Sequence, residues 1–350
     1  MGAITNALTG VIQWLYGIVL NHGWAIVLFT VLIRILLMPL DISSRKGMRK
    51  MQKIQPQINA LQKKYANDKA KLQQKQSELM KREHYSPLSG CLPLLIQMPI
   101  LFAMFGAMRA IANEQIVKQV FEFLQGNTPG YEGWLWVKNI WMADSLFAPM
   151  APDLRSIQMI GTEVWRAVWA TLGEGQQQLI LQNIAQNQQA FAGTLDFSSA
   201  ATLKEVIPFI TTALQGMPAY VAQIQMMDGV GTINLIVFQL NVYARFNGLL
   251  ILPVLAGLSQ VLMTKMNPQA TGAAPQAAGT GAQQPGMGGF MKYFFPLFSV
   301  YICLTSNAAF ALYWVTSNLI ATGMSYGINL YFDRKEKLVE VNKLQEGTVK

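Results

Sequence analysis

The sequence predicts an all-α polytopic membrane protein with five transmembrane helices, an outside N-terminus and an inside C-terminus. Of its 350 residues, 52% are hydrophobic and only 13% are charged, whereas soluble domains carry about 25% charged residues. Five apolar windows approach or reach the length needed to cross about 30 Å of hydrocarbon. The net charge of +9 is unevenly distributed along the chain, and this asymmetry predicts the orientation.

The apolar windows and the segments between them divide the chain into ten parts. Residues 1–20 have apolar side chains at helical spacing and no charged side chain, which predicts an amphipathic helix on the outer membrane interface. No cleavable signal is visible, so the first span is expected to direct insertion. The predicted spans are residues 21–41, 89–111, 247–266, 291–305 and 308–332. The remaining parts are residues 42–88, 112–246, 267–290 and 333–350.

The charges of the two longest connecting segments predict which side of the membrane each occupies. Residues 41–87 contain twelve Lys or Arg and four Asp or Glu, so this net charge of +8 predicts a cytoplasmic location. Residues 112–247 contain six bases and ten acids, and we expect this segment to fold outside as a helical subdomain. Cys91 and Cys303 then lie at opposite faces and are not expected to pair.

The cytoplasmic segment 42–88 is predicted to form an antiparallel helical hairpin. Its two helical runs, residues 48–65 and 68–83, are separated by a turn at Ala66-Asn67. Composition leaves two readings open: a solvated hairpin without a partner, or an arm that recruits anionic lipid, ribosomal RNA or an emerging polypeptide. The bases expected to recruit are Arg45, Lys46, Arg49, Lys50, Lys53, Lys63 and Lys64. Residues 267–290, by contrast, suit a flexible linker.

Polar residues in the predicted spans share one depth. Arg34, Gln97, Gln260 and Ser299 each lie six or seven residues from the cytoplasmic boundary, or about 10 Å inside it. Polar groups within membranes usually face protein or water, so their common level predicts a hydrated groove, which Thr30, Thr322 and Ser325 would extend. Two alternatives stay open: the arginine side chain could snorkel to the interface, and the neutral residues could make ordinary interhelical hydrogen bonds.

Several motifs, in order, resemble the YidC membrane protein insertases. They are NHGWAIVLFTVLIRILLMPL, KMQKIQPQINALQKKY, SPLSGCLPLLIQMPILFAMF, LPVLAGLSQVLMTKMNP and ALYWVTSN. The resemblance covers most of the chain outside the long outer loop and the linker. It implies a groove in the cytoplasmic leaflet that is closed outside, is open to the cytoplasm and to lipid, and contains a positive charge corresponding to Arg34.

The resemblance also implies a path and partners. Newly made membrane proteins would slide along the second and fifth spans, past Met98, Pro99, Phe102, Phe105, Tyr313 and Ser317. The chain would act in the bacterial cell membrane as a chaperone of protein transport, with the ribosome, the Sec translocon and anionic lipids as further partners and no DNA. Asn307, Ala309 and residues 321–323 depart from the family pattern, and the role of the long outer loop is not implied.

Enzyme chemistry is not expected from this sequence. It contains no Walker motif, His22 and His84 are isolated, and neither cysteine has a neighbouring ligand pattern, so we expect no catalytic residue, cofactor or metal. The leading alternative function is a small organic-anion transporter that uses Arg34 as its anion site, although transporters commonly show internal repeats and none is visible here. A purely structural chaperone is a weaker alternative, since it would not need a charge in the membrane.

Overall fold

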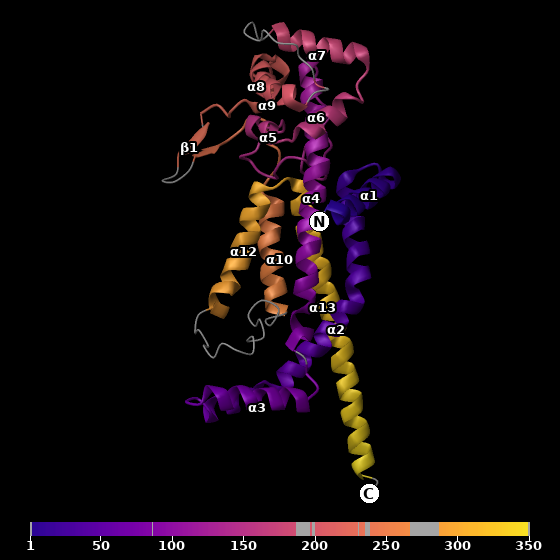
Figure 1. Cartoon of the computed structure of the whole chain (residues 1–350), viewed down its shortest axis with the longest axis vertical. Helices are drawn as coiled ribbons and strands as arrows, with labels where there is room; N and C mark the ends of the chain where they lie inside the picture. The colour runs from indigo at the N-terminus through magenta and orange to yellow at the C-terminus, as the bar shows by residue number, and fades with distance from the viewer. Residues whose placement is uncertain are drawn as a thin grey trace. The chain divides into compact units, whose positions relative to one another are not determined.

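The structure, a computed structural model, describes residues 2–85, 87–186, 197, 200–229, 231–234, 239–266 and 287–348. Within these ranges, the side chains of residues 87–97, 200–204, 287–292 and 340–348 are not described. The described chain is mostly helical and divides into two compact units (Figure 1). Unit 1 comprises Met1–Val27, Ala103–Val254 and Val300–Tyr313, and unit 2 comprises Leu28–Phe102, Leu255–Ser299 and Trp314–Lys350.

The predicted spans lie on five helices that each contribute residues to both units. These helices are α2 (His22–Lys64), α4 (Pro87–Leu124), α10 (Ile251–Met266), α12 (Met287–Thr305) and α13 (Ala308–Thr348). Within the described residues, α2 and the Met98–Leu124 part of α4 are long and apolar enough to cross a membrane, while α10 and Tyr293–Thr305 are shorter apolar helices. The five-span count and the orientation therefore stay predictions.

Helix α2 joins two segments that the sequence analysis treats separately. It runs without interruption from the apolar residues of the first predicted span into the first arm of the basic hairpin, although it contains Pro39 and Pro56. Each proline removes one backbone donor, and the helix nevertheless continues through both. Helix α13 likewise extends beyond the predicted fifth span into the C-terminal tail.

Unit 1 has a large apolar core formed by the end of α4 and by short helices of the 112–246 segment. The helices α5 (Leu154–Gln158), α6 (Thr162–Trp169), α7 (Glu174–Gln186), α8 (Ala200–Gly216) and α9 (Pro218–Ile224) gather around that end of α4 (Figure 1). Phe121, Trp165 and Tyr220 are among the largest fully buried side chains. Each such side chain contributes roughly 1.5–3 kcal/mol by burial, so this segment has its own packed core.

A short β-hairpin is the exception to the all-α prediction. Strands β1 (Thr232–Asn234) and β2 (Gln239–Asn241) pair antiparallel, with Ile233 opposite Leu240. Gly229 and Gly231 precede β1 with φ of 81° and 42°, a left-handed backbone that glycine adopts without strain. Strand β1 contains Thr232 and Ile233, whose branched side chains favour strands.

A buried polar network fixes the loops of unit 1. The side chain of Asn247 accepts a bond from Asn139 N at 2.7 Å and donates to the carbonyls of Asn139 and Ala143 at 2.8 and 2.9 Å. The side chain of Asn139 in turn donates to Gln119 Oε1 at 3.1 Å and to Met150 O at 2.8 Å. Backbone groups supply most of these partners, so the network holds the loops in one arrangement.

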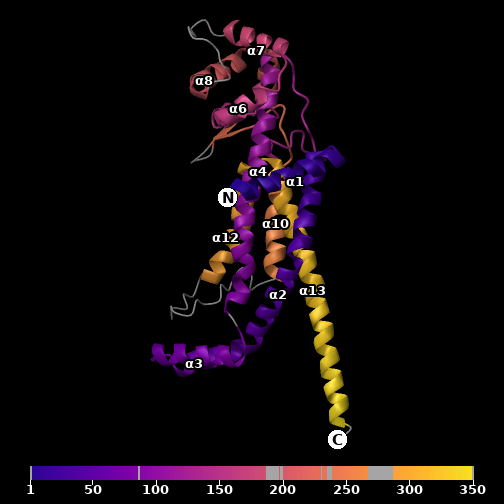
Figure 2. The same ribbon diagram turned by 45° about the vertical axis from the view of Figure 1, so that its right-hand side comes forward.

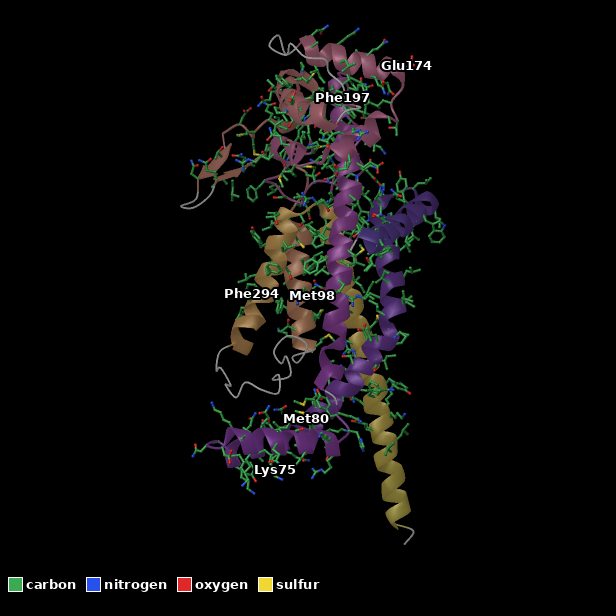
Figure 3. All side chains as sticks on the ribbon, in the orientation of Figure 1. Lys75, Met80, Met98, Glu174, Phe197 and Phe294 are labelled. Atoms are coloured by element: carbon green, nitrogen blue, oxygen red, sulfur yellow. The ribbon has the colours of Figure 1, made fainter. Side chains whose placement is uncertain are left out.

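The basic hairpin of unit 2 closes through a small apolar cluster, Ile54, Ile58, Leu79 and Tyr85. Its second arm is α3 (Lys69–Arg82), whose first turn is capped by Asp68. Lys75 and Met80 lie on opposite sides of α3, and Met80 packs against the apolar cluster (Figure 3). The C-terminal half of α13 runs away from α3 in both views of the ribbon (Figure 2).

Candidate functional site

A polar cluster lies within unit 2, on the apolar parts of three helices. We call Arg34 of α2, Ser259 and Gln260 of α10, and Ser317 and Asn318 of α13 the Arg34 cluster. The arginine side chain is half-buried, and its Nε and Nη2 donate to Ser317 Oγ at 3.1 and 2.5 Å. A hydroxyl is neutral, so this contact orients the guanidinium and leaves its positive charge uncompensated by its partner.

Asn318 extends the cluster from α13 to α10. Its Nδ2 donates to Ser259 Oγ at 3.2 Å and to Gln260 Oε1 at 3.3 Å, and all three side chains are buried. Asn318 and Ser259 were missed as site residues by the sequence analysis. A usable signal was present, because each residue directly adjoins a predicted site residue, Ser317 or Gln260, in an apolar helix.

The other predicted groove residues differ in how their polar atoms are satisfied. Ser299 is buried and donates to Phe295 O of its own helix at 2.8 Å. Thr322 Oγ1 is buried and has no hydrogen-bond partner in the part of the chain that the structure describes. Thr30 is also buried, and the side chain of Gln97 lies outside the described residues. An unpartnered buried hydroxyl usually marks a place where water or a ligand binds.

Three of the predicted recruiting bases contact α13. Arg45 donates to Ser325 Oγ, so this base joins a residue predicted for the groove. Arg49 binds Asp333 Oδ1 at 2.7 Å, and Lys53 binds Glu336 Oε1 at 2.9 Å. The contacts advance in the same direction along both helices, so α2 and α13 run parallel within unit 2. Lys46, Lys50, Lys63 and Lys64 are exposed.

The six residues predicted to line the slide fall into two groups by exposure. Met98, Pro99, Phe102 and Phe105 are exposed, as a surface that meets apolar chains or lipid would be. Tyr313 and Ser317 are buried, and Ser317 belongs to the Arg34 cluster. In unit 1, Phe105 contacts the ring of Phe310 edge-on at 5.1 Å.

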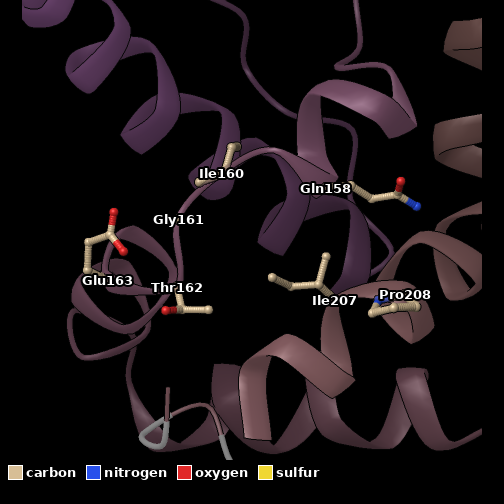
Figure 4. Close-up of a pocket in the computed structure, with 7 residues that line it drawn as sticks. All are labelled: Gln158, Ile160, Gly161, Thr162, Glu163, Ile207 and Pro208. Carbon is tan, nitrogen blue, oxygen red and sulfur yellow. The ribbon is translucent and has the colours of Figure 1, made fainter. Parts of the chain in front are cut away.

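A separate pocket of about 550 Å³ opens in unit 1 between α5, α6 and α8 (Figure 4). Among the described residues that line it, Glu163 is the charged one, and it lies across the pocket from Ile207 and Pro208. The Glu163 carboxylate lies so close to Gly161 that a Cβ there would collide with it. This carboxylate is therefore placed at the start of α6, where negative charge is favourable. Among the described residues, no three His, Cys, Asp or Glu side chains gather as a metal site requires.

Apolar helices that enclose an arginine and several buried polar side chains are typical of a helical membrane protein with a polar site in its apolar region. Residues 14–336 match one family along almost the whole chain. The chain belongs to the 60Kd inner membrane protein family. Family and apolar helices together identify a bacterial membrane protein.

Several relatives match parts of the chain. A protein of Clostridium perfringens is 39% identical over 153 residues, which are 41% of this chain and 58% of the relative. Proteins of Fusobacterium nucleatum and Aromatoleum aromaticum are 47% and 41% identical over 90 and 102 residues, covering 26% and 29% of this chain and 44% and 18% of those relatives. All three are named membrane protein insertase YidC, and the matches span between about a fifth and three fifths of their lengths.

Proposed function

We propose that this chain is a membrane protein insertase that moves polar segments of newly made membrane proteins across the bilayer. The observation that carries the proposal is the half-buried Arg34 guanidinium, held by a neutral hydroxyl among buried polar side chains of apolar helices. An arginine at the centre of a membrane costs about 2.5–3.5 kcal/mol on insertion scales, so a function that uses the charge is a reason to retain it. Family membership and the names of the relatives support the same function.

The proposed arrangement has five spans, an outside N-terminus and an inside C-terminus. The Arg34 cluster then lies in the cytoplasmic leaflet, and the groove around it opens to the cytoplasm and to lipid. The unpartnered Thr322 hydroxyl supports a hydrated groove, because water can satisfy a buried polar atom that lacks a protein partner. The exposed residues Met98, Pro99, Phe102 and Phe105 would border the side that is open to lipid.

The chemistry of the cluster suits a temporary partner for an acidic segment. A hydrogen bond to a neutral hydroxyl contributes about 0.5–1.5 kcal/mol net. A carboxylate 4 Å from a guanidinium gains about 4 kcal/mol at an effective dielectric constant of 20. A carboxylate can therefore displace Ser317 from Arg34 and still leave afterwards, because both charges regain water or lipid headgroups. The apolar part of the substrate gains its burial when it moves sideways into lipid.

The cytoplasmic hairpin would divide its bases between two roles. Arg45, Arg49 and Lys53 contact α13 and would hold the two helices together at the entrance of the groove. Exposed Lys46, Lys50, Lys63 and Lys64 are the bases that would attract a ribosome, an anionic lipid surface or an emerging polypeptide.

The test is insertion by the purified full chain reconstituted in liposomes. The substrate is a single-span protein with an acidic tail, compared with the same protein whose tail Asp and Glu are changed to Asn and Gln. Arg34→Ala should lower insertion of the acidic substrate about tenfold, the effect of roughly 1.4 kcal/mol, and should spare the neutral one. Arg34→Lys should retain much of the activity, and Arg155→Ala, which removes an exposed arginine of unit 1, is the matched control.

The alternative, an organic-anion transporter, predicts a different outcome in the same liposomes. Uptake of a labelled dicarboxylate that depends on Arg34, without insertion of either substrate, would favour transport. Equal insertion of both substrates by Arg34→Ala would remove the case for a charged groove and favour a snorkelling arginine.

A further inference from the structure

A tight turn in unit 1 presents a leucine where turn chemistry favours other residues. Trp134 and Val137 exchange two backbone hydrogen bonds of 2.9 Å, which closes a two-residue turn over Leu135 and Trp136. Leu135 has a φ of 51°, and its side chain is 66% exposed. Two-residue turns with positive φ at this position are dominated by Gly, Asn and Asp.

This leucine carries two separate costs in water. A left-handed backbone places its Cβ close to the following carbonyl oxygen, which is unfavourable for a bulky side chain. Exposure of the isobutyl group to water forfeits the gain of burial. A residue that is both strained and exposed indicates an apolar environment outside the protein that accepts this side chain.

The turn is held rigidly from both sides, so the leucine is presented in a fixed direction. On one side, the Trp134 ring packs directly on Gly23 of α2, and Asn21 Nδ2 donates to Gly133 O at 3.1 Å. On the other side, Trp136 Nε1 donates to Asp144 Oδ2 at 3.1 Å. Because Asp144 is fully buried, this bond anchors the turn to the core of unit 1.

The junction between α1 (Gly2–Val19) and α2 also contains a leucine that is both exposed and in a left-handed conformation. Leu20 has a φ of 54° and is 74% exposed, and Trp14 and Ile18 lie exposed on one face of α1. The other face of α1 buries Ile12 and Leu15. Two left-handed, exposed leucines therefore flank the start of α2.

The exposed face of α2 shows where its contact with an apolar environment begins. Trp24 is exposed, and it shares one helical face with Leu28, Leu32 and Ile35, which are also exposed. A stripe of that kind on a helix long and apolar enough to cross a membrane faces lipid, and Trp24 is its outermost member. The Trp24 and Trp134 rings, both in unit 1, meet edge-on at 5.6 Å, so the turn contacts the outermost residue of the stripe.

We infer that the turn 134–137, together with Leu20, is a rigid anchor in the outer leaflet that inserts Leu135 among phospholipid acyl chains near the glycerol. Indole rings favour this depth of the membrane, and the exposed Trp24 ring lies beside the turn. Lipid fits better than a partner protein because the turn contacts Trp24, the outermost residue of the exposed stripe on α2, and because two exposed leucines, Leu135 and Leu20, lie at the ends of short connections in unit 1. The inference rests on α2 crossing the membrane and is independent of the transported substrate.

The experiment measures the depth of single labels on the full chain in phosphatidylcholine vesicles. Cys91 and Cys303 are replaced by alanine, and an environment-sensitive fluorophore is attached at Leu135→Cys or Leu20→Cys. Leu32→Cys is the control for the span, and Gln186→Cys, an exposed polar position on α7, is the control for water. Vesicles whose acyl chains are brominated near the glycerol should quench the labels at positions 135 and 20 by about half and leave the label at 186 unchanged. Vesicles whose acyl chains are brominated near their ends should quench the label at position 32, which lies about 15 Å along the helix.

Each outcome separates the anchor from the span. Quenching at 32 without quenching at 135 overturns the anchor while α2 remains a membrane helix. A label at 135 that is shielded from water but insensitive to brominated lipid also overturns it, and points to a protein or a second copy of the chain on this surface. Absence of quenching at 32 removes the premise itself, and the inference fails with it.

Discussion

The two units each bury a polar network, and the networks differ in what satisfies them. In unit 1, Asn139 and Asn247 bind backbone groups, with Gln119 as their main side-chain partner. In unit 2, the Arg34 cluster is joined by bonds between side chains and contains a cation. Both networks are largely buried, so burial alone does not distinguish them.

The difference indicates which network is structural and which is available to a substrate. A side chain that is bound to backbone groups cannot leave without exposing them, and the loss of such a bond leaves a buried donor or acceptor unsatisfied. A guanidinium bound to one neutral hydroxyl can exchange that partner for a carboxylate. Thr322 lies on the same helix as Ser317, and its hydroxyl lacks a partner in the described residues, so it can also bind water or a polar group of the substrate.

The largest effect is expected from Asp144→Ala in unit 1. The buried carboxylate accepts bonds from Leu249 N at 2.8 Å, Leu252 N at 2.7 Å and the Trp136 indole, and thereby caps the start of α10. Loss of three charge-assisted bonds should lower the free energy of unfolding by at least about 3 kcal/mol. Denaturant unfolding in detergent micelles measures the loss.

Asp153→Ala is the matched control for this cap. Asp153 caps the five-residue helix α5 through Ser156 N at 3.0 Å, and the substitution should cost about 1 kcal/mol. Equal costs for the two substitutions would show that the buried network of unit 1 does not depend on Asp144.

The second prediction is that Arg34→Ala, unlike Asp144→Ala, has little effect on stability. Because the arginine binds one hydroxyl and sits at a cost in an apolar region, its removal should change the free energy of unfolding by less than about 1 kcal/mol. Its effect should appear in insertion of acidic segments instead. A loss of stability as large as that of Asp144→Ala would place Arg34 among the structural residues and break the contrast between the units.

The third prediction is a pH dependence confined to unit 1. Burial raises the pKa of the Tyr220 phenol, whose hydroxyl donates to Pro152 O at 2.8 Å, and burial also raises the pKa of Tyr131. The folded state therefore holds these protons more tightly than the unfolded state. Their stabilisation is complete below the unfolded pKa of about 10 and declines as the pH rises above it.

Tyr220→Phe tests the alkaline sensitivity. The variant should lose about 1 kcal/mol at neutral pH, because Pro152 O loses its donor, and should lose less than the parent between neutral pH and strongly alkaline pH. Circular dichroism at a series of pH values measures both differences. A parallel decline in parent and variant would assign the alkaline transition to other groups.

The smallest effect is expected from Leu135→Asn, and it should be a gain. Asparagine accepts the left-handed backbone better than leucine, so the free energy of unfolding in detergent should rise by about 0.5–1 kcal/mol. In lipid vesicles the lost contact of the leucine with acyl chains should cancel part of that gain. Leu135→Ala, which removes apolar area but keeps the backbone strain, separates the two contributions. A loss of stability in detergent would mean that the leucine packs within the protein.

Much of the helical architecture and the position of the charged site were predictable from the sequence. The apolar windows and the basic hairpin required only local patterns, and Arg34 and Gln260 were found because polar residues are rare in such windows. Asn318 and Ser259 were missed because a single polar side chain in an apolar helix does not reveal its partner on another helix. The strand pair β1 and β2 was missed because three-residue strands leave little periodicity to detect.

The sequence by itself determined which environment each segment favours: apolar windows favour lipid or a protein core, and clustered bases favour water. These are properties of single side chains and of local spacing, so they survive without any tertiary contact. Only the tertiary structure decided which polar groups are satisfied. It paired Arg34 with Ser317, placed Arg45, Arg49 and Lys53 in contact with α13, and held Leu135 exposed in a strained turn. Such pairings join residues up to nearly 300 positions apart, and no local pattern encodes which of many distant groups will meet.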